Sequence, residues 1–582
     1  MKVAHLTTVD LSLRYLLFPQ LRAVVDQGGE TLGISAPGPW VAELEAAGVR
    51  HVPLPTSTRG MNPGRDVRAA VQLWRILRRE EPDILHTHNP KPGLYGRIIG
   101  RLAGVPMVVN TVHGLYATPQ DPLPKRALIY GLEAMASRFS DGELVQSRED
   151  LELMLRWRIA PRNRTHFLGN GVDLTRFDPN RFDQEHRDRV REQLGIGTDQ
   201  VLVGMVGRLV AEKGFLELFE AARSLDSHYR IVCIGPHDPD KPDGLEESIL
   251  HEARARGIGF LGMRTDLDEL YPAMDLLVLP SHREGFPRAA MEGAAMGIPV
   301  IASNIRGCRE VVEHDANGLL VAVRNPQALA AAIMALGEDA ARRKAMSQTA
   351  RRRAEEHFDE RKVVAIVMET YRKLARRMGL GLFDDVDAEA VTLRSARPSD
   401  ADALAGLHIR AIPGFLPRLG RRLMRLLYRA LANSPDAVVL VADDGKGPIG
   451  FIAGVIDTGR FYRRFLTRYG LSALLATLPK LANPWIVRRG WETLRYGATG
   501  SETPAELLAM AVVPAARGVG LGTTLGSRFL EEMSSRGVDR VKVVVGADNS
   551  GGIAAYSKIG FRNAIPVEVH SHEASVELTW PA

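Results

Sequence analysis

The feature of this sequence that most constrains its fold is an alternation of short apolar runs with helical patterns over residues 1–360. Runs such as KVAHLT, DILHTH and MVVNTV alternate with stretches such as DVRAAVQLWRILRREE, whose apolar residues recur at helical spacing. The alternation returns after about residue 176, with VLVGMVG, RIVCIGP, LLVLPS and PVIASN as expected strands. This pattern predicts two α/β domains of similar size, each built on a parallel sheet, with a cleft between them.

The pattern changes after the second alternation. The stretch RKVVAIVMETYRKLARRMG reads as a cationic amphipathic helix, and an acidic, helix-poor stretch follows it. The remainder reads as a strand, helices, and then strands with a glycine-rich turn, which indicates an α+β domain. We therefore expect domains at 1–175 and 176–360, a closing helix and linker at 361–390, and a last domain at 391–582.

Composition narrows the class of protein. The chain of 582 residues has 75 Lys and Arg against 69 Asp and Glu, a slight excess that disfavours a general nucleic-acid binder. No run approaches the roughly 20 apolar residues that a membrane span needs, and the start MKVAHLTTVD lacks a signal-peptide pattern, so we expect a cytoplasmic protein. Cys233 and Cys308 form no CxxC pair, so neither a disulfide framework nor a zinc site is expected.

One local stretch is strongly basic. Residues 460–496 hold eight basic residues against a single acid, Glu492, interleaved with aromatic residues and leucines. Together with the cationic helix at 361–379, this pattern is typical of peripheral contact with an anionic membrane. A pair of basic helices packed on their own domain fits the same pattern.

Two glutamates eight positions apart stand out in the stretch SHREGFPRAAMEG. Glu284 lies in a loop after an apolar strand, and Glu292 lies on the helix that follows, with Pro287 suited to the first turn of that helix. In parallel α/β sheets, ligands bind at such strand-to-helix loops, where backbone amides and the helix dipole favour an anion. One carboxylate for each of two sugars, with phosphates held between them, would explain the spacing.

The stretch EGFPRAAMEGAAMGIPVIAS resembles the E-x7-E signature of the retaining glycosyltransferases of family 4, which have the GT-B fold of two Rossmann-like domains. VGRLVAEKGF, LGNGVDLTRF and NTVHGLY resemble further motifs of that family, in the same order. The resemblance implies a UDP-sugar donor and transfer without a metal. It also implies the following roles: Arg208 and Lys213 on the donor diphosphate, His113 near the reacting sugar, Glu284 on sugar hydroxyls, the amides of Gly285 and Phe286 on phosphate, and Glu292 on the ribose.

The first strand-to-helix loop departs from the family. It reads TVDLSLRYLLFPQ, without the frequent Gly-Gly pair, so acceptor contacts are not carried over. This loop and HTHNPKPGLYGR nevertheless resemble the enzymes that act on lipid-linked oligosaccharides, which implies a glycan linked to undecaprenyl diphosphate as the acceptor. We interpret His86 and His88 as packed histidines at a strand end. A nucleotide-sugar epimerase on the same fold is an alternative.

The C-terminal region carries a second phosphate motif. Within LLAMAVVPAARGVGLGTTLGSRFLEEMSSRG, a strand and a glycine-rich turn precede an amphipathic helix, but the glycine spacing differs from the dinucleotide pattern. This turn resembles the R/Q-x-x-G-x-G/A motif of GCN5-related N-acetyltransferases (GNAT), and VVVGADNSGGIAAYSKIGFRNA resembles a later motif of that family. The resemblance implies acetyl-CoA as co-substrate, held by Arg517, Gly518, Gly520, Gly522 and Asn549, with Tyr556 as the acid that protonates the leaving thiolate.

Glu506, at the start of the same strand, is our candidate base, although a solvated glutamate on an edge strand is the simpler interpretation. The two resemblances together predict a bifunctional enzyme of bacterial surface-polysaccharide or glycan synthesis, which N-acetylates an amino sugar and transfers a sugar. The alternative is a glycosyltransferase whose GNAT region only binds acetyl-CoA or docks another protein.

Overall fold

The structure is a computed structural model. It describes residues 1–582 except 59, 61–62, 89, 239–242, 381, 383–389, 413, 478–485, 487, 490–502, 571–572 and 582. Most of the expected linker and part of the basic stretch at 460–496 therefore lie outside the described residues. The chain forms two compact units, Met1–Thr370 and Tyr371–Ala582.

The first unit begins with a seven-stranded, fully parallel sheet in the order β3-β2-β1-β4-β5-β6-β7. Its strands are β1 (Lys2–Val9), β2 (Glu30–Ala36), β3 (Val49–Pro53), β4 (Ile84–Thr87), β5 (Met107–Val112), β6 (Gly142–Val145) and β7 (Thr165–Phe167). All residues of β4, β5 and β6 are buried, as expected for strands covered on both faces.

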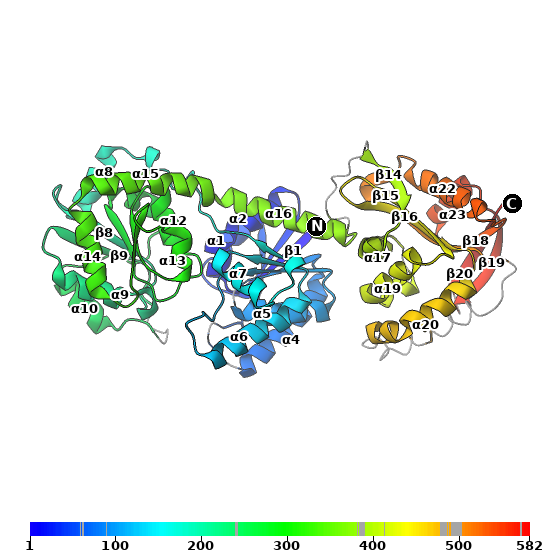
Figure 1. The fold of residues 1–582 in the computed structure, drawn as a ribbon, viewed down its shortest axis with the longest axis horizontal. Coiled ribbons are helices and arrows are strands. Elements are labelled where there is room, and N and C mark those ends of the chain that lie inside the picture. The colour runs from blue at the N-terminus through cyan, green and yellow to red at the C-terminus, as the bar shows by residue number, and fades with distance from the viewer. Residues whose placement is uncertain are drawn as a thin grey trace. The chain divides into compact units, whose positions relative to one another are not determined.

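Helices cover both faces of this sheet. They are α1 (Asp10–Leu16), α2 (Phe18–Asp26), α3 (Val41–Ala46), α4 (Pro63–Glu80), α5 (Pro90–Ala103), α6 (Leu123–Ala136) and α7 (Arg148–Arg156). Helices α4, α5 and α6 lie side by side on one face, while α1, α2 and α3 cluster near β1, β2 and β3 (Figure 1).

A second parallel sheet follows in the same unit, in the order β10-β9-β8-β11-β12-β13. Its strands are β8 (Val201–Val206), β9 (Tyr229–Ile234), β10 (Gly259–Phe260), β11 (Leu276–Leu279), β12 (Val300–Ser303) and β13 (Gly318–Val321). Two parallel α/β sheets, as predicted, therefore make up the first unit. In each sheet the carboxyl ends of the strands lead into loops that can carry a site.

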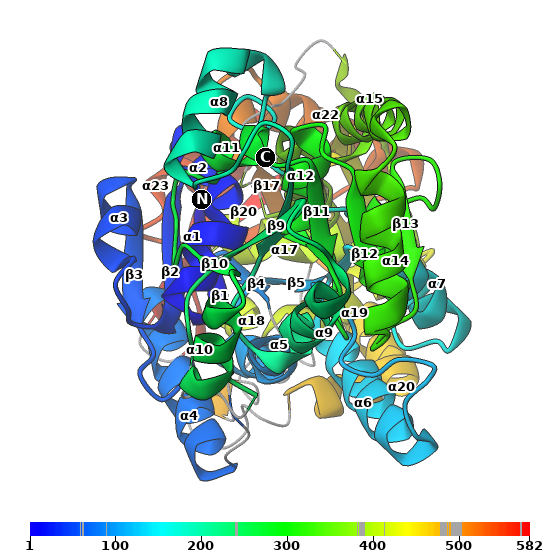
Figure 2. The same ribbon diagram turned by 90° about the vertical axis from the view of Figure 1, so that its left-hand side faces the viewer.

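The helices around the second sheet divide between two cores. They are α8 (Gln184–Gln193), α9 (Phe215–Ala221), α10 (Glu247–Ala255), α11 (Leu267–Leu270), α12 (Arg288–Ala295), α13 (Arg306–Val311), α14 (Pro326–Gly337) and α15 (Ala340–His357). Helices α9, α10 and α14 pack their apolar side chains on one face of the sheet, and α8, α11 and α12 pack on the other (Figure 2).

Helix α16 (Glu360–Arg377) spans the boundary between the two units. Its apolar side chains, including Val367, Met368 and Leu374, are buried. Ile366 on the same helix is exposed, and the expected membrane contact at 361–379 stays a prediction.

The second unit holds a mixed sheet in the order β14-β15-β16-β17-β18-β20-β19. Its strands are β14 (Thr392–Ser395), β15 (Ala437–Asp443), β16 (Pro448–Val455), β17 (Glu506–Val512), β18 (Val541–Gly546), β19 (Arg562–His570) and β20 (Glu573–Trp580). All neighbours are antiparallel except β17 and β18. These two pair in parallel only at Glu506–Lys542 and Leu507–Val543, and beyond this point they separate.

The helices of this unit pack on one large core. They are α17 (Ala401–Ala411), α18 (Phe415–Arg418), α19 (Arg421–Ala432), α20 (Thr458–Thr477), α22 (Leu521–Ser535) and α23 (Ser550–Lys558). Among the described residues of both units, no helix combines the length and the apolarity that crossing a membrane requires.

Candidate active sites

The loop between β11 and α12 brings together two of the predicted donor-site residues. The Lys213 ammonium lies 2.6 Å from the Glu284 carboxylate, and the Ser281 hydroxyl donates to the same carboxylate oxygen at 2.8 Å. Lys213 ends a short 3-10 helix and is followed by Gly214, which has a φ of +83°. A Cβ at Gly214 would collide with the carbonyl of Pro280, so glycine allows the Lys213 segment to approach the loop closely.

Gly285 is the point of closest approach between the two parallel sheets' loops. A Cβ at Gly285 would collide with the backbone carbonyl oxygen of His113, and the α-carbon of Gly285 lies against Gly114. On its other side, Gly307 packs its backbone against the carbonyl of Glu284. The loop is therefore held from both sides by backbone, and glycine is the residue that fits.

The amides of Gly285 and Phe286 precede α12, whose N-cap is Pro287. This position suits an anion, because the first amides of a helix have no partner within the helix. The Phe286 ring packs edge-on against Phe358, with ring centroids 6.0 Å apart. Its side chain therefore anchors the loop to the core, which leaves the backbone as the group available to a ligand.

Glu292 is buried on α12, and both of its carboxylate oxygens have partners. One accepts a hydrogen bond from the Tyr271 hydroxyl at 3.0 Å, and the other accepts from Arg288 at 2.9 Å. Arg288 also donates to the backbone carbonyl of Tyr15, which lies in α1, in the segment that was expected to be the first strand-to-helix loop. Each carboxylate oxygen can accept a further hydrogen bond, so a ribose that binds Glu292 would share it with Tyr271 and Arg288 or replace one of them.

Arg208 lies in the loop after β8, where its guanidinium is 3.5 Å from the carboxylate of Asp238. The side chain is about one-third exposed. This loose pairing leaves the guanidinium accessible, as a contact with a ligand phosphate would require. In contrast to Lys213, Arg208 pairs with Asp238 and forms no ion pair with Glu284 among the described residues.

His113, which follows β5, is held at both ring nitrogens. Its Nδ1 is 3.1 Å from the side-chain oxygen of Gln146, and its Nε2 is 3.1 Å from His88 Nδ1. Burial lowers the pKa of His113 to about 4, so the ring is neutral near pH 7. His86 and His88 are buried at the end of β4, in agreement with their interpretation as packed histidines.

Contacts between the two halves of the first unit were not predicted from the sequence. Arg306 forms an ion pair with the buried Asp150 at 2.5 Å, and Glu310 accepts a hydrogen bond from Ser147 at 2.6 Å. Each pair joins residues more than 150 positions apart in the chain. No local pattern signals them, because each partner looks like an ordinary surface residue in its own segment.

The predicted acyl-CoA turn lies between β17 and α22 in the second unit. Gly518 and Gly520 both have a φ of +85°, so consecutive amides can face one concave side as in an anion-binding nest. A Cβ at Gly518, Gly520 or Gly522 would meet no atom within 4 Å. Arg517 is exposed and donates to the Val512 carbonyl at 3.1 Å, so backbone amides dominate this site.

Asn549 and Tyr556 lie on α23. The Asn549 side chain accepts from the Gly552 amide at 2.8 Å and so caps the helix, a structural role in addition to the predicted contact with CoA. The Tyr556 ring packs edge-on against Phe561. Burial raises the pKa of Tyr556 to about 12, so its hydroxyl keeps a proton that it can donate.

Glu506 is not a solvated residue of an edge strand. It is buried on β17, which lies inside the sheet between β16 and β18. Burial raises the pKa of its carboxyl, while the nearby Lys542 ammonium opposes this shift, and Thr458 donates to it at 3.2 Å. Glu506 is paired with Lys542 in the short parallel register of β17 and β18, one position before the last pair, Leu507–Val543. Sequence reasoning missed Lys542, since a lysine in a strand is usually exposed.

Comparison with known families agrees with this arrangement. Residues 20–176 match the family "Glycosyltransferase Family 4", residues 186–353 match "Glycosyl transferases group 1", and residues 410–561 match the "Acetyltransferase (GNAT) family". The first two matches cover the two parallel sheets except β1, and the third covers β15, β16, β17 and β18 of the mixed sheet.

Curated proteins resemble the first unit. The chain is 31% identical over 299 residues to the UDP-Gal:alpha-D-GlcNAc-diphosphoundecaprenol alpha-1,3-galactosyltransferase of Escherichia coli, covering 50% of this chain and 76% of the relative. It is 24% identical over 382 residues to the N,N'-diacetylbacillosaminyl-diphospho-undecaprenol alpha-1,3-N-acetylgalactosaminyltransferase of Campylobacter jejuni, covering 65% and 99%.

Among solved structures, the Anabaena protein HepE in complex with UDP has a similar fold. The TM-score is 0.54 at 22% identity, and the match covers 64% of this chain and 100% of HepE. At this identity the likeness concerns the fold, and it supports the arrangement of two Rossmann-like domains in the first unit.

Proposed function

The chain belongs to the group 1 and family 4 glycosyltransferases and carries a C-terminal domain of the GNAT acetyltransferase family, and we propose that it both transfers a sugar and acetylates an amino sugar. The sugar would pass from a UDP-sugar to an acceptor linked to undecaprenyl diphosphate, in the synthesis of a bacterial surface polysaccharide or glycan. One observation carries the proposal: Lys213 and Glu284 meet at the N-terminus of α12, beside the His113 carbonyl.

The acceptor class is inferred from two relatives, whose names both specify a diphospho-undecaprenol acceptor. Both names also specify an alpha linkage, which fits retention of configuration from an α-linked nucleotide sugar. In the proposed reaction, the bond between C1 of the sugar and the diphosphate breaks, and a bond from C1 to the acceptor oxygen forms on the same face. The proton of the acceptor hydroxyl passes to the leaving diphosphate.

The residues of the first unit have distinct roles in this scheme. Lys213 and Arg208 stabilise the negative charge that grows on the leaving diphosphate, with help from the amides at the start of α12. Lys213 already faces Glu284, so the diphosphate competes with this carboxylate for the ammonium. Glu284 then becomes available to accept hydrogen bonds from sugar hydroxyls, and Glu292 to accept them from the ribose.

Because these cationic groups would supply the charge stabilisation, we propose transfer without a metal ion. EDTA treatment should leave the transfer rate unchanged within about twofold, while the same treatment abolishes a metal-dependent control enzyme. Loss of transfer that is restored by a divalent cation would contradict this part of the proposal.

In the second unit, acetyl-CoA would supply an activated acetyl group as a thioester. The glycine turn and the N-terminus of α22 would hold its pyrophosphate. Glu506 accepts the proton that the attacking amine loses, and its raised pKa makes it a stronger base than an ordinary carboxylate. Tyr556 donates its hydroxyl proton to the sulfur as the C–S bond breaks.

Peripheral contact with an anionic membrane is part of the proposal, and it rests on α20. This helix exposes Arg463 and Arg468 near its middle, and Leu471, Leu474 and Leu475 towards its end. Cationic groups next to exposed leucines are typical of an interfacial helix. The protein should sediment with vesicles that contain phosphatidylglycerol, and a Leu471→Ser/Leu475→Ser variant should sediment less. Equal sedimentation with neutral vesicles would contradict an electrostatic contact.

The experiment that tests the proposal uses labelled acetyl-CoA, a panel of UDP-amino sugars and the purified full-length protein. Label in one nucleotide sugar would identify the donor and place acetylation before transfer. A second reaction adds synthetic undecaprenyl-diphosphate-linked GlcNAc and follows sugar transfer by chromatography. Absence of transfer with every UDP-sugar and acceptor tested would contradict the first activity.

The Tyr556→Phe variant separates catalysis from docking in the second unit. It keeps the ring and its packing against Phe561 but removes the proton that the thiolate needs. Loss of acetylated sugar with normal binding of CoA supports a catalytic domain. An unchanged product would favour a domain that binds without turnover.

A further inference from the structure

Four histidines cluster on neighbouring strands. Three of them, His5, His88 and His113, are linked in a row by hydrogen bonds, whereas His86 Nε2 lies 2.8 Å from the Thr111 hydroxyl. His5 lies on β1, His86 is the third residue of β4, His88 follows β4, and His113 follows β5. These strands are adjacent in the sheet, and His5 is the registered partner of His86. The row leads from the interior of the sheet to the loop that touches Gly285.

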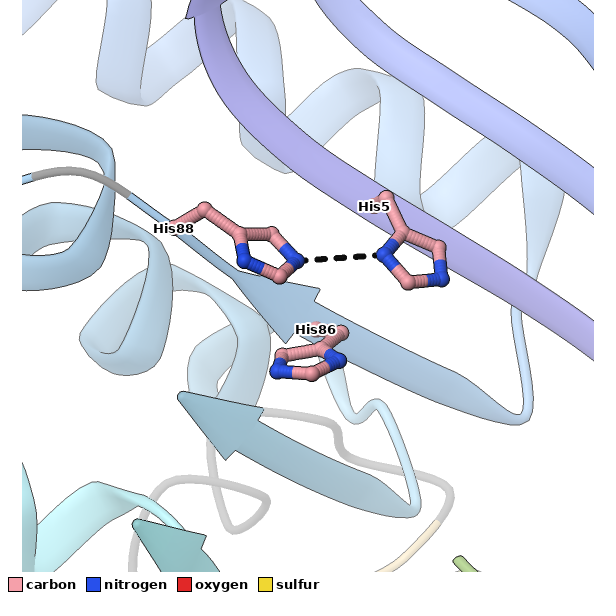
Figure 3. Close-up of side chains that lie close together, drawn as sticks. All are labelled: His5, His86 and His88. Carbon is pink, nitrogen blue, oxygen red and sulfur yellow. Dashed lines mark hydrogen bonds between the residues drawn. The ribbon is translucent and has the colours of Figure 1, made fainter. Parts of the chain in front are cut away.

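In each hydrogen bond of the row, the two bonded nitrogens lie between the two ring centroids. His5 Nδ1 and His88 Nε2 are 3.1 Å apart, while the ring centroids are 5.3 Å apart and the ring planes differ by only 11°. The centroids are therefore farther apart than the nitrogens by about the width of one ring, so each nitrogen points at the other (Figure 3). His88 and His113 repeat this arrangement, with nitrogens 3.1 Å and centroids 5.4 Å apart.

This geometry distinguishes a hydrogen-bonded row from a metal site. Nitrogens of His5, His86 and His88 all lie within 4.8 Å of one another, which is close enough to consider an ion. Zinc sites are tetrahedral with zinc–nitrogen bonds of about 2.0–2.1 Å, so the ligating nitrogens converge on the ion and do not point at one another. His5 and His88 face each other at 3.1 Å, which fits an N–H···N hydrogen bond instead.

All four rings are neutral near pH 7. Burial lowers the pKa of His5 to about 3 and that of His113 to about 4, and it places the pKa values of His86 and His88 well below the usual range. A neutral imidazole has one N–H donor and one acceptor nitrogen. His88 and His113, which are bonded at both ring nitrogens, therefore each donate once and accept once, so the bonds of the row must run in the same direction.

The two ends of the row determine that direction. If Gln146 accepts from His113 Nδ1, then His113 Nε2 accepts from His88 Nδ1, and His88 Nε2 accepts from His5 Nδ1. This leaves a lone pair on His5 Nε2, which is buried and has no hydrogen-bond partner among the described residues. The opposite direction would leave a buried N–H there, and unpaired buried N–H groups are the rarer outcome.

We infer that His88 is a positioning residue for sugar transfer, which holds neutral His113 in the Nδ1–H tautomer and keeps its backbone carbonyl against Gly285 of the donor loop. The inference rests on the proposed transferase function for its catalytic consequence, but not for its structural content. Because both ring nitrogens of His113 are engaged, His113 acts by position and does not exchange a proton with the substrate. This agrees with a leaving diphosphate that takes the acceptor proton.

Two variants of His88 separate position from bulk. His88→Gln keeps one N–H donor and one acceptor, so it can continue the row in the same direction. His88→Leu has similar bulk but neither group. We expect His88→Leu to lower kcat for transfer by about 10- to 100-fold, with the KM for the UDP-sugar changed by less than about threefold, and His88→Gln to stay within about threefold of the natural protein.

The tautomer is measured directly by NMR of the full-length protein with ¹⁵N-labelled histidine, assigned with a His113→Gln variant. In the natural protein and in His88→Gln, His113 should show a protonated Nδ1 and a lone-pair Nε2 between pH 6 and 8. In His88→Leu, His113 should lose this single tautomer. This readout does not need a substrate, so it decides the inference even if no UDP-sugar is transferred.

Three results would overturn the inference. The first is a protonated Nε2 on His113, or a His113 ring that titrates near pH 6.5 in the natural protein. The second is an equal loss of activity in His88→Gln and His88→Leu when both variants unfold at the same temperature as the natural protein. The third is a shift of the His5, His86 and His88 signals on addition of one equivalent of Zn²⁺, which would favour a metal site. If His88→Leu fails to fold, the natural protein and His88→Gln still decide the tautomer.

Discussion

Two helix N-termini of this chain are candidate sites for a diphosphate, and they are built in different ways. Before α12, Gly285 is pressed against the His113 carbonyl, and charged side chains meet at Glu284. Before α22, the space around Gly518, Gly520 and Gly522 is open, and positive φ angles orient the amides. The first site is a product of packing between distant segments, whereas the second is a local backbone conformation.

The difference has a functional meaning under the proposed activities. Sugar transfer must stabilise negative charge on the leaving diphosphate, so cationic side chains belong in the reaction itself. In acetyl transfer the pyrophosphate of CoA serves only for binding, because it is remote from the bond that breaks. Backbone amides are sufficient for that purpose, and the predictions below test this contrast in order of decreasing effect.

The difference in charge between the two candidate diphosphate sites should produce the largest effect. Lys213→Met should lower transfer by about 100- to 1000-fold, because it removes a group that stabilises charge in the transition state. Arg517→Met should raise the KM for acetyl-CoA by less than about fivefold, because an exposed ionic contact contributes only about 0–1 kcal/mol. Transfer is followed with labelled UDP-sugar, and acetylation by release of free thiol.

Lys213→Arg provides the matched control, since it keeps the charge next to Glu284, and circular dichroism checks that each variant is folded. Comparable losses at Lys213 and Arg517 would remove the distinction between a charged site and a backbone site.

The difference in free space around the glycines of the two sites should produce the next largest effect. Gly285→Ala places a Cβ on the His113 carbonyl, and the loop must move to relieve the collision. Transfer should fall by about 100-fold, since a displacement near 1 Å can have that effect on catalysis. Acetylation by the same protein should be unchanged, which serves as an internal measure of folding. Near-normal transfer would show that the two loops separate during the reaction.

Gly520→Ala should have a moderate effect of another kind. Its Cβ would meet no neighbour, but the φ of +85° costs a residue with a side chain about 1–2 kcal/mol. We expect about a 10-fold rise in the KM for acetyl-CoA as the turn relaxes. Gly522→Ala, which is open and lies in the first turn of α22, should change the KM by less than about twofold. A larger effect at Gly522 than at Gly520 would indicate that CoA needs the space itself.

The smallest effect at neutral pH concerns Glu506. Glu506 must be deprotonated to act as a base, and burial raises its pKa. As the pH falls, acetylation should therefore decline at a higher pH than it would with an ordinary glutamate as the base. Transfer should not share this acid limb. The pH profile of acetylation, measured with and without Glu506→Gln, checks the assignment, and an acid limb that persists in the variant would contradict it.

The comparison of the two sites also shows what sequence reasoning could reach. The strands, the loop after LLVLPS and the glycine turn follow from short-range patterns, and the structure agrees with them. The pairing of Lys213 with Glu284 was expected only as a shared binding region, and the structure adds the direct contact. The partners of Glu292, namely Tyr271 and Arg288, were not predicted, because no pattern near Glu292 identifies them.

Glu506 and His88 illustrate the same limit. Glu506 was the candidate base, with a solvated glutamate as the simpler interpretation. The sheet places it inside, beside Thr458 and next to Lys542, which lies 36 positions later in the sequence. His88 is a packed residue, as expected. Its hydrogen bonds to His5 and His113 also have a direction, because each ring nitrogen either donates or accepts. In both cases the property that matters is created by residues from other elements.

The sequence by itself determined the type and order of the elements, the two families and the glycine turn before α22, because apolar periodicity and positive φ angles depend on residues only a few positions apart. Only the tertiary structure decided that Gly285 meets the His113 carbonyl, that three histidines share one row of hydrogen bonds, and that Glu506 is buried. Burial, and the pKa shifts and contacts that follow from it, arise where segments distant in the sequence exclude water from one another.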